Sequence, residues 1–399
     1  MWLYLLIFLI PVVAYFTTKN TGNVRDKKFL FVFLAGLALF VGMSDMFGGY
    51  DRYIYSEVFD GIADITDSGG DYAFRGAFTA FESEIGWTWL NIFISYFTAN
   101  RYIFILTITL LTYTLLFVSL RRYATNYPLA LIFFFGLWFF FTFTYLRQVL
   151  GATLVWLSIP YIINRKLWKF LIFALIGMML HKSAIIFVPV YFFVHRTYSR
   201  GAIITLMVIA LLIGISPLPN LVFTTYGDLS QVEMAEDYNS IGGFRVAYFL
   251  EAVFFLWLLL KDYDRQRAKM SMERRVLFNI SLLFCVTLLF FVRSENGGRL
   301  SWYYIIGILC TTPAIVERSI NRQGMASLMI VLSLFLYFRI YDSWQNYLNL
   351  YPYKTFLTNG YRNGDYSWQH YEYNHTYDLN KFCRPVIRVK VNTNGLWPK

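Results

Sequence analysis

Residues 144–194 read TYLRQVLGATLVWLSIPYIINRKLWKFLIFALIGMMLHKSAIIFVPVYFFV. The stretch holds three apolar segments and three polar breaks. The first break, Arg147-Gln148, lies at the start of the first segment, the second is a basic turn over 164–169, and the third is His181-Lys182. Ionisable side chains are costly in apolar surroundings and usually mark a functional site when they occur there. If the first and third breaks lie on one side of a membrane and the second on the other, Arg147 and His181 share a face. The stretch therefore predicts helices that cross a bilayer and carry a polar site at one end.

The composition of the whole chain supports this interpretation. Of its 399 residues, 57% are hydrophobic, 21% are aromatic and only 15% are charged. Such a chain is a polytopic membrane protein rather than a soluble globule. The net charge of +11 falls mostly in short breaks between apolar runs, so we expect a lipid bilayer and not nucleic acid as the partner. Three cysteines are too few and too scattered for a disulfide framework or a thiolate metal site.

Twelve apolar runs are long enough, or nearly long enough, to span a bilayer. They cover residues 1–17, 28–43, 101–120, 128–144, 148–163, 166–180, 183–195, 202–216, 244–260, 276–292, 300–317 and 324–341. The first run lacks a positive leader and a small-residue cleavage site, so we expect a retained helix there rather than a signal peptide. The sequence thus predicts an all-α polytopic membrane protein with about 12 transmembrane helices.

A shorter apolar segment at 85–98 is placed by the distribution of positive charge. If it does not cross the membrane and the amino terminus lies outside, most Lys and Arg residues before the tail fall in the cytoplasmic breaks. Those breaks are 18–27, 121–127, 164–169, 196–201, 261–275 and 318–323. A crossing at 85–98 would turn the basic breaks from 121 onward outward, against the positive-inside rule. We therefore predict an interfacial or re-entrant helix at 85–98 on the outer face.

The same topology divides the chain into one membrane domain and one tail. The predicted transmembrane domain covers 1–341 and carries outer loops at 44–84 and 217–243. Residues 342–399 form a polar tail that is also expected outside. No repeat of fixed period or low-complexity segment divides the chain further.

Arginines on the predicted outer face suggest a site for an anion. Arginine makes fixed bidentate contacts with phosphate and does not lose its charge. Arg147, Arg299 and Arg52 are therefore candidates to hold a pyrophosphate at the membrane surface, and Gln148 opens the helix beside Arg147. The alternative for each arginine is a helix cap or an anchor to lipid head groups.

Other groups on this face suit proton transfer or sugar binding. His181 titrates near neutral pH, which suits a base that takes a proton from a sugar hydroxyl. Glu84, at the rim of 85–98, and Asp51, after Tyr50, are carboxylates that suit a base or a grip on an acceptor sugar. The alternatives are a carbonyl-bonded histidine, solvated acids and an aromatic belt at the interface. We expect no metal and no cofactor, since neither metal-ligand spacing nor a Gly-rich phosphate loop is present.

With these residues in view, the chain resembles the EpsG family of bacterial exopolysaccharide polymerases, which are relatives of the Wzy O-antigen polymerases. The matching pieces are GGYDRYIYSEVF at 48–59, ESEIGWTWLN at 82–91, YLRQVLGATLVW at 145–156, LHKSAIIFVPVY at 180–191, a late Arg299 followed by Tyr303 and Pro313, and YPYKTFLTN at 351–359. They run through most of the chain. The chain departs from the family in its long tail after Asn359.

The resemblance implies a multi-helix protein of the bacterial inner membrane, similar to the GT-C class of lipid-linked sugar transferases. Such a protein joins oligosaccharide repeat units carried on undecaprenyl pyrophosphate. This reaction fits the candidate residues above, with Arg147 and Arg299 on the leaving pyrophosphate and His181 or Glu84 near the incoming hydroxyl. The other residues predicted to bind substrate are Arg52, Asp51, Gln148, Tyr50 and Tyr303. The expected partners are the lipid-linked donor and acceptor, the bilayer and a chain-length regulator.

Three other functions stay open at this stage. A ligase that passes finished polysaccharide to another acceptor would use the same pyrophosphate grip. A transporter or flippase of lipid-linked sugars needs charges along a path through the midplane, and here Glu251 is the main mid-helix charge. A membrane acyltransferase with a histidine base is the third.

Overall fold

The computed structural model describes residues 1–18, 22–46, 49–219, 243–261, 263–294, 297–344, 350, 353–358 and 381–388. Within these residues the regular elements are all helices, and Ser44 and Thr355 form an isolated antiparallel bridge. The elements are α1 (Trp2–Thr18), α2 (Lys27–Gly42), α3 (Tyr50–Asp67), α4 (Ile85–Ser95), α5 (Arg101–Tyr123), α6 (Tyr127–Leu137), η2 (Phe139–Phe143), α7 (Leu146–Trp156), α8 (Ile159–Ile163), α9 (Leu167–Leu180), η3 (Lys182–Phe187), α10 (Val190–Phe193), α11 (Arg200–Ile215), α14 (Val246–Leu260), α15 (Tyr263–Gln266), η4 (Arg267–Lys269), α16 (Met272–Phe290), η5 (Gly297–Tyr304), α17 (Ile305–Arg318) and α18 (Arg322–Trp344).

Each apolar run of the sequence forms one or two helices, which makes this a helical membrane protein. By length and composition, four described helical stretches are suited to cross a membrane: Arg101–Tyr123, Leu146–Ile163, Gly297–Arg318 and Arg322–Ser343. Shorter apolar helices are Trp2–Thr18, Tyr127–Leu137, Leu167–Leu180, Lys182–Phe193, Arg200–Ile215 and Val246–Leu260. The exact number of crossings stays a sequence prediction.

Capping residues explain where several of these helices begin. Side chains of Asp26, Asn100, Asn126, Ser199 and Ser271 each accept a hydrogen bond from a backbone N–H in the first turn of the helix that follows. Such bonds satisfy N–H groups that have no partner inside the helix. The polar breaks between the apolar runs therefore also determine where the helices start.

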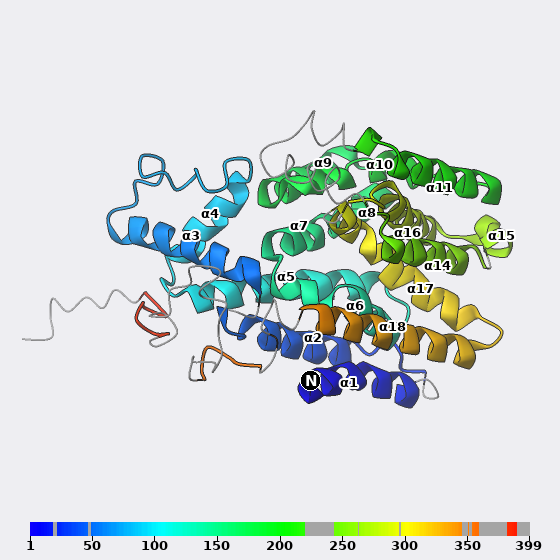
Figure 1. Ribbon diagram of the computed structural model, residues 1–399, viewed down its shortest axis with the longest axis horizontal. Coiled ribbons are helices and arrows are strands. Elements are labelled where there is room, and N and C mark those ends of the chain that lie inside the picture. Colours follow the sequence, from blue (N-terminus) through cyan, green and yellow to red (C-terminus); the bar gives the residue numbers. More distant parts are fainter. Residues whose placement is uncertain are drawn as a thin grey trace, which may run out of the picture.

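The helices pack side by side into one bundle, from α1 and α2 at the lower edge to α9, α10 and α11 at the upper edge of Figure 1. Helix α16 packs against α11, α14 and α17, while α6 packs against α1 and α18. The core between them is dominated by aromatic and aliphatic side chains. Dispersion contacts of this kind hold helices together in a membrane, where lipid is as apolar as the core.

The segment before α5 differs from the sequence prediction. We predicted a loop at 44–84, but 18 of its residues form helix α3. The helix predicted at 85–98 is present as α4 and ends at Ser95. Helices α3 and α4 pack on each other and on the start of α5, and they extend from one end of the bundle (Figure 1).

Candidate functional site

The predicted residues Glu84, Arg147 and His181 come together at the end of the bundle beside α3 and α4. Glu84 immediately precedes α4, Arg147 lies in the first turn of α7, and His181 connects α9 to η3. The Arg147 guanidinium donates to Glu84 Oε2 in an ion pair. Glu84 Oε1 accepts the backbone N–H of Lys182 at 2.9 Å and lies 3.8 Å from His181 Nδ1. The Glu84 carboxylate thus connects the Arg147 break with the His181 break of the 144–194 stretch.

Close packing between α7 and α9 makes this meeting possible. A Cβ atom on Gly177 would lie 2.4 Å from Val155 Cγ1, so only glycine leaves room for the neighbouring helix. A Cβ on Gly151 would approach the Gly177 carbonyl oxygen at 3.4 Å and His181 Cβ at 3.6 Å. Small residues let helix backbones approach closely in membranes. Gly177 therefore lets α9 pack closely on α7, while a side chain on Gly151 would make only ordinary contacts.

Arg147 is held from several sides. Its guanidinium carbon lies 4.0 Å from the ring centroid of Phe81 and 5.0 Å from that of Tyr55. The Arg147 side chain is 19% exposed and the Glu84 side chain only 5%. Cation–π contact and a largely buried ion pair both favour a single orientation. A planar, partly exposed guanidinium is thus presented at the end of the bundle.

His181 is neutral and its proton position is assigned by its neighbours. The backbone N–H of Ser183 donates to Nδ1 at 3.3 Å, and Ser183 Oγ lies 2.7 Å from the same nitrogen. Nδ1 is therefore an acceptor, and the neutral ring carries its proton on Nε2. Burial, together with the positive charges of Arg147 and Arg299, lowers the pKa of His181 well below its usual range. The ring thus offers an N–H donor and not a free base nitrogen.

Tyr303 and Gln148 join the same region from η5 and α7. Ser183 Oγ lies 2.8 Å from the Tyr303 hydroxyl, which links η5 to the loop of His181. Gln148 Nε2 donates to the Arg299 carbonyl at 3.2 Å. The Arg299 guanidinium carbon lies 4.7 Å from the ring centroid of Tyr145. These two contacts, from Gln148 and from Ser183, therefore hold η5, the 3-10 helix that carries the second arginine.

Asp51 adds a second carboxylate to the cluster. Its backbone N–H donates to Thr144 Oγ1 at 3.1 Å, and the Tyr55 hydroxyl donates to its Oδ2 at 3.3 Å. Burial raises the pKa of Asp51, while the charges of Arg299 and Arg147 oppose that rise. A carboxylate with a raised pKa is a better proton acceptor. The side chain of Tyr50, the last predicted sugar contact, lies outside the described side chains.

Arg52 does not join this cluster, which corrects its prediction as a substrate ligand. The side chain is fully buried, and its guanidinium donates to the carbonyl oxygens of Val41, Gly42 and Ser44 and to Ser44 Oγ. These carbonyls lie at or just after the end of α2, where backbone acceptors lack partners inside the helix. Burial lowers the pKa of Arg52 to about 10. Arg52 thus caps a helix, which is the alternative that the sequence left open.

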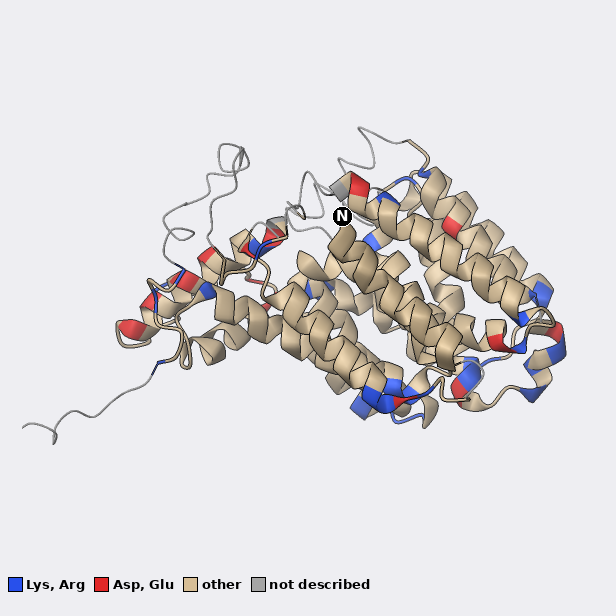
Figure 2. Ribbon diagram, turned by 90° about the horizontal axis from the view of Figure 1, so that it is seen from below, with Lys and Arg blue, Asp and Glu red and all other residues tan. Residues whose placement is uncertain are grey.

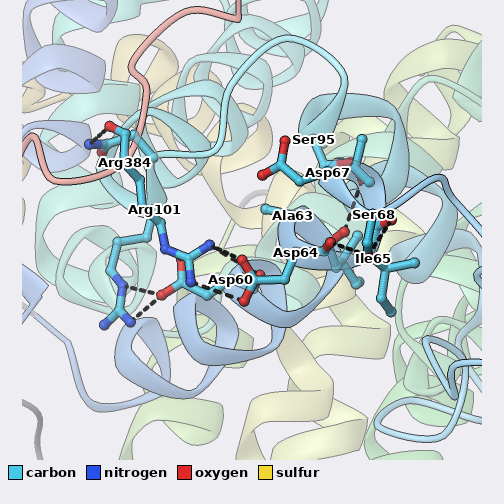
Figure 3. Close-up of polar contacts among 12 residues, drawn as sticks. Asp60, Ala63, Asp64, Ile65, Asp67, Ser68, Ser95, Arg101 and Arg384 are labelled. Carbon is cyan, nitrogen blue, oxygen red and sulfur yellow. Dashed lines mark hydrogen bonds and ion pairs between the residues drawn. The ribbon is translucent and has the colours of Figure 1, made fainter.

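Helix α3 is held over the cluster by pairs that the sequence analysis missed. Figure 3 shows Asp60, Asp64 and Asp67 along one side of α3. Arg101 at the start of α5 pairs with Asp60, and the segment 381–388 supplies the partners of the other two. From that segment Arg384 Nη1 lies 2.7 Å from Asp64 Oδ1. The three aspartates are spaced so that they lie on one face of a helix, and this spacing could have revealed the acidic face of α3 in the sequence.

The fold and the cluster define a class of protein: a polytopic helical membrane protein with a paired arginine and carboxylate site at one end of its bundle. Among the described residues, no group of three or more His, Cys, Asp or Glu side chains is arranged to hold a metal ion.

The sequence model of the EpsG family matches residues 27–355, and the chain belongs to this family. The match begins at α2 and takes in every described residue of the cluster. No curated protein and no solved structure matched the chain. Membership in this family indicates an exopolysaccharide polymerase.

Proposed function

We propose that this protein is a glycosyltransferase that joins oligosaccharide repeat units carried on undecaprenyl pyrophosphate. The observation that carries the proposal is the gathering of Arg147, Arg299, His181, Glu84 and Asp51 at one end of a helix bundle. Two fixed cations suit the anionic leaving group, and a carboxylate beside them suits the incoming hydroxyl. Family membership agrees with this chemistry.

The arginines act on the leaving group in this proposal. Arg147 and Arg299 contact the pyrophosphate and stabilise the negative charge that grows as the sugar departs. Neutral His181 donates its Nε2–H to an oxygen of the same group. Glu84 is a positioning residue rather than a base, because one oxygen is paired with Arg147 and the other accepts the Lys182 N–H.

Asp51 takes the acceptor proton. The hydroxyl oxygen of the new unit forms a bond to the anomeric carbon of the growing chain, and the bond from that carbon to the pyrophosphate oxygen breaks. The hydroxyl proton moves to the Asp51 carboxylate, and lipid pyrophosphate leaves with the bonding electrons. This assignment replaces His181 and Glu84 as the base, because Nδ1 of the histidine is engaged with Ser183 and both Glu84 oxygens are occupied.

The setting of this reaction follows from the charge distribution along the chain. Basic breaks at the opposite end of the bundle favour a cytoplasmic position for that end, so the site faces the exterior side of the bacterial inner membrane. A chain-length regulator is the expected protein partner.

Deletion of the gene from the parent bacterium tests the proposal. A polymerase deletion leaves surface glycans of a single repeat unit. Chains of normal length that stay attached to lipid would instead identify a ligase. Repeat units retained on the cytoplasmic side would identify a flippase. The same cells complemented with the wild-type gene are the control, and only the first outcome agrees with the proposal.

A further inference from the structure

A cavity lies at the opposite end of the bundle from Arg147. Its volume is about 180 Å³. Helix α5 begins with Arg101, beside Asp60, and ends with Tyr123 at this cavity. A helix of 23 residues is roughly 35 Å long at 1.5 Å per residue. The cavity and the cluster around Arg147 are therefore separate sites.

The rim of this cavity is strongly positive. Five cationic residues line it: Arg25, Arg122, Lys269, Arg274 and Arg318. Glu273 is the one acidic residue of the lining. The Lys and Arg positions at the lower right of Figure 2 show the surrounding end of the bundle, far from the acidic helix α3 at the left. A cavity with this charge attracts an anion.

Two residues of the cavity lining carry buried hydroxyl groups that lack partners within the described part of the chain. Tyr123 is 5% exposed, and its hydroxyl has no hydrogen-bond partner within the described part of the chain. The Thr125 hydroxyl is likewise buried and unpartnered there. Both residues line the cavity, next to the apolar side chains of Leu277 and Phe278. Buried polar groups are normally hydrogen-bonded, so two such hydroxyls in one cavity suggest a polar ligand.

Helix capping accounts for only part of this arrangement. Arg122 and Arg318 lie in the last turns of α5 and α17, where cations interact favourably with the helix dipole. Lys269 and Arg274 lie in η4 and at the start of α16, where that reason does not apply. Helix capping and membrane orientation both favour cations at this end of the bundle, and neither requires a cavity or unpartnered hydroxyls.

We propose that this cavity binds a phosphate group, carried by an anionic lipid head group or by a soluble phosphate ester. Arg122, Lys269 and Arg274 contact the phosphate oxygens, and the Tyr123 hydroxyl donates to one of them. The apolar side chains leave room for a glycerol or acyl portion. This site is independent of the proposed transfer reaction, since it lies at the other end of the bundle.

Binding is tested with the purified full-length chain in detergent, by following its thermal unfolding midpoint against probe concentration. The probes are dihexanoyl phosphatidylglycerol, dihexanoyl phosphatidylcholine and sodium phosphate. We expect the phosphatidylglycerol to raise the midpoint saturably and the phosphatidylcholine to have little effect. Competition by sodium phosphate would identify a soluble phosphate ester as the ligand. A lack of competition would identify an anionic lipid head group. Both results support a phosphate site.

Variants connect the binding to the cavity. Lys269→Gln/Arg274→Gln should weaken the affinity for the anionic probe about tenfold or more, because charge-assisted hydrogen bonds are lost. Tyr123→Phe should weaken it about threefold and should not lower the midpoint without probe, because the hydroxyl has no protein partner. Arg267→Gln removes a neighbouring cation that does not line the cavity and is the control.

The proposal is overturned by any of three results. The first is that neither anionic probe binds saturably, and the second is that the zwitterionic and anionic lipids bind alike. The third is that the double variant binds the anionic probe as tightly as the control variant does. A folding defect of the double variant would leave Tyr123→Phe as the deciding comparison, because that change removes a single oxygen atom.

Discussion

Replacement of Arg147 is the most informative test of the candidate site. Its side chain pairs with Glu84, lies over Phe81 and Tyr55, and remains 19% exposed. Arg147→Ala removes both a proposed pyrophosphate ligand and the partner of a buried carboxylate. The two losses have different measurable consequences, and a second variant separates them.

The magnitudes follow from this geometry. Loss of a contact that strengthens as the leaving group departs costs about 2 to 4 kcal/mol of transition-state stabilisation. That corresponds to a rate roughly thirtyfold to a thousandfold lower. Leaving Glu84 without its partner costs about 3 to 5 kcal/mol of folding stability. Arg147→Ala/Glu84→Gln removes that uncompensated charge, so it should recover most of the stability and little of the rate. Arg147→Lys keeps the charge without the planar fork and should be intermediate in rate.

The assay measures polymer length and accumulation of lipid-linked single units in cells that carry each variant. Membrane levels and unfolding midpoints are recorded for each protein. Arg75→Ala, a change on the exposed loop between α3 and α4, is the control. If the Arg147→Ala/Glu84→Gln protein is stable and polymerises like the control, Arg147 only anchors a helix end and the proposed site is wrong.

Four further outcomes are expected. Turnover should be lost as pH falls through the raised pKa of Asp51, because the carboxylate must be ionised to accept a proton. The acid limb of the pH profile should lie above the usual aspartate pKa of about 4. Asp51→Asn should be inactive at every pH. Asp60→Asn should lower stability by about 3 to 5 kcal/mol, because it removes the negative charge of a buried ion pair with Arg101. Asp64→Asn should cost less than about 1 kcal/mol, because the Asp64 side chain is 62% exposed, and unfolding in detergent gives both values. In a cysteine-free background, Phe74→Cys in the predicted outer loop should react with an impermeant thiol reagent in intact spheroplasts, and Ala268→Cys in a predicted cytoplasmic break should not. The opposite labelling would show that the predicted membrane orientation is wrong. Extension of lipid-linked units by the purified protein should persist in EDTA, because arginines are proposed to stabilise the pyrophosphate, and a loss restored by magnesium would contradict that role.

The sequence alone determined the class of protein and the location of its polar groups along the chain. Apolar runs of near-spanning length predict membrane helices because unpaired backbone groups are too costly in lipid, and every run proved helical. Charges inside a mainly apolar stretch made Arg147 and His181 candidate site residues. Motif pieces spread along the chain indicated the family to which it belongs.

Tertiary structure decided which of the marked residues meet and in what state. Arg52 and Arg147 look alike in the sequence, yet one caps α2 and the other pairs with Glu84, because burial and partners come from helices distant along the chain. The protonated nitrogen of His181 depends on the N–H of Ser183, and the acidity of Asp51 depends on its burial and on two arginines. Such properties depend on distances between side chains from different helices, and the order of residues along the chain does not contain those distances.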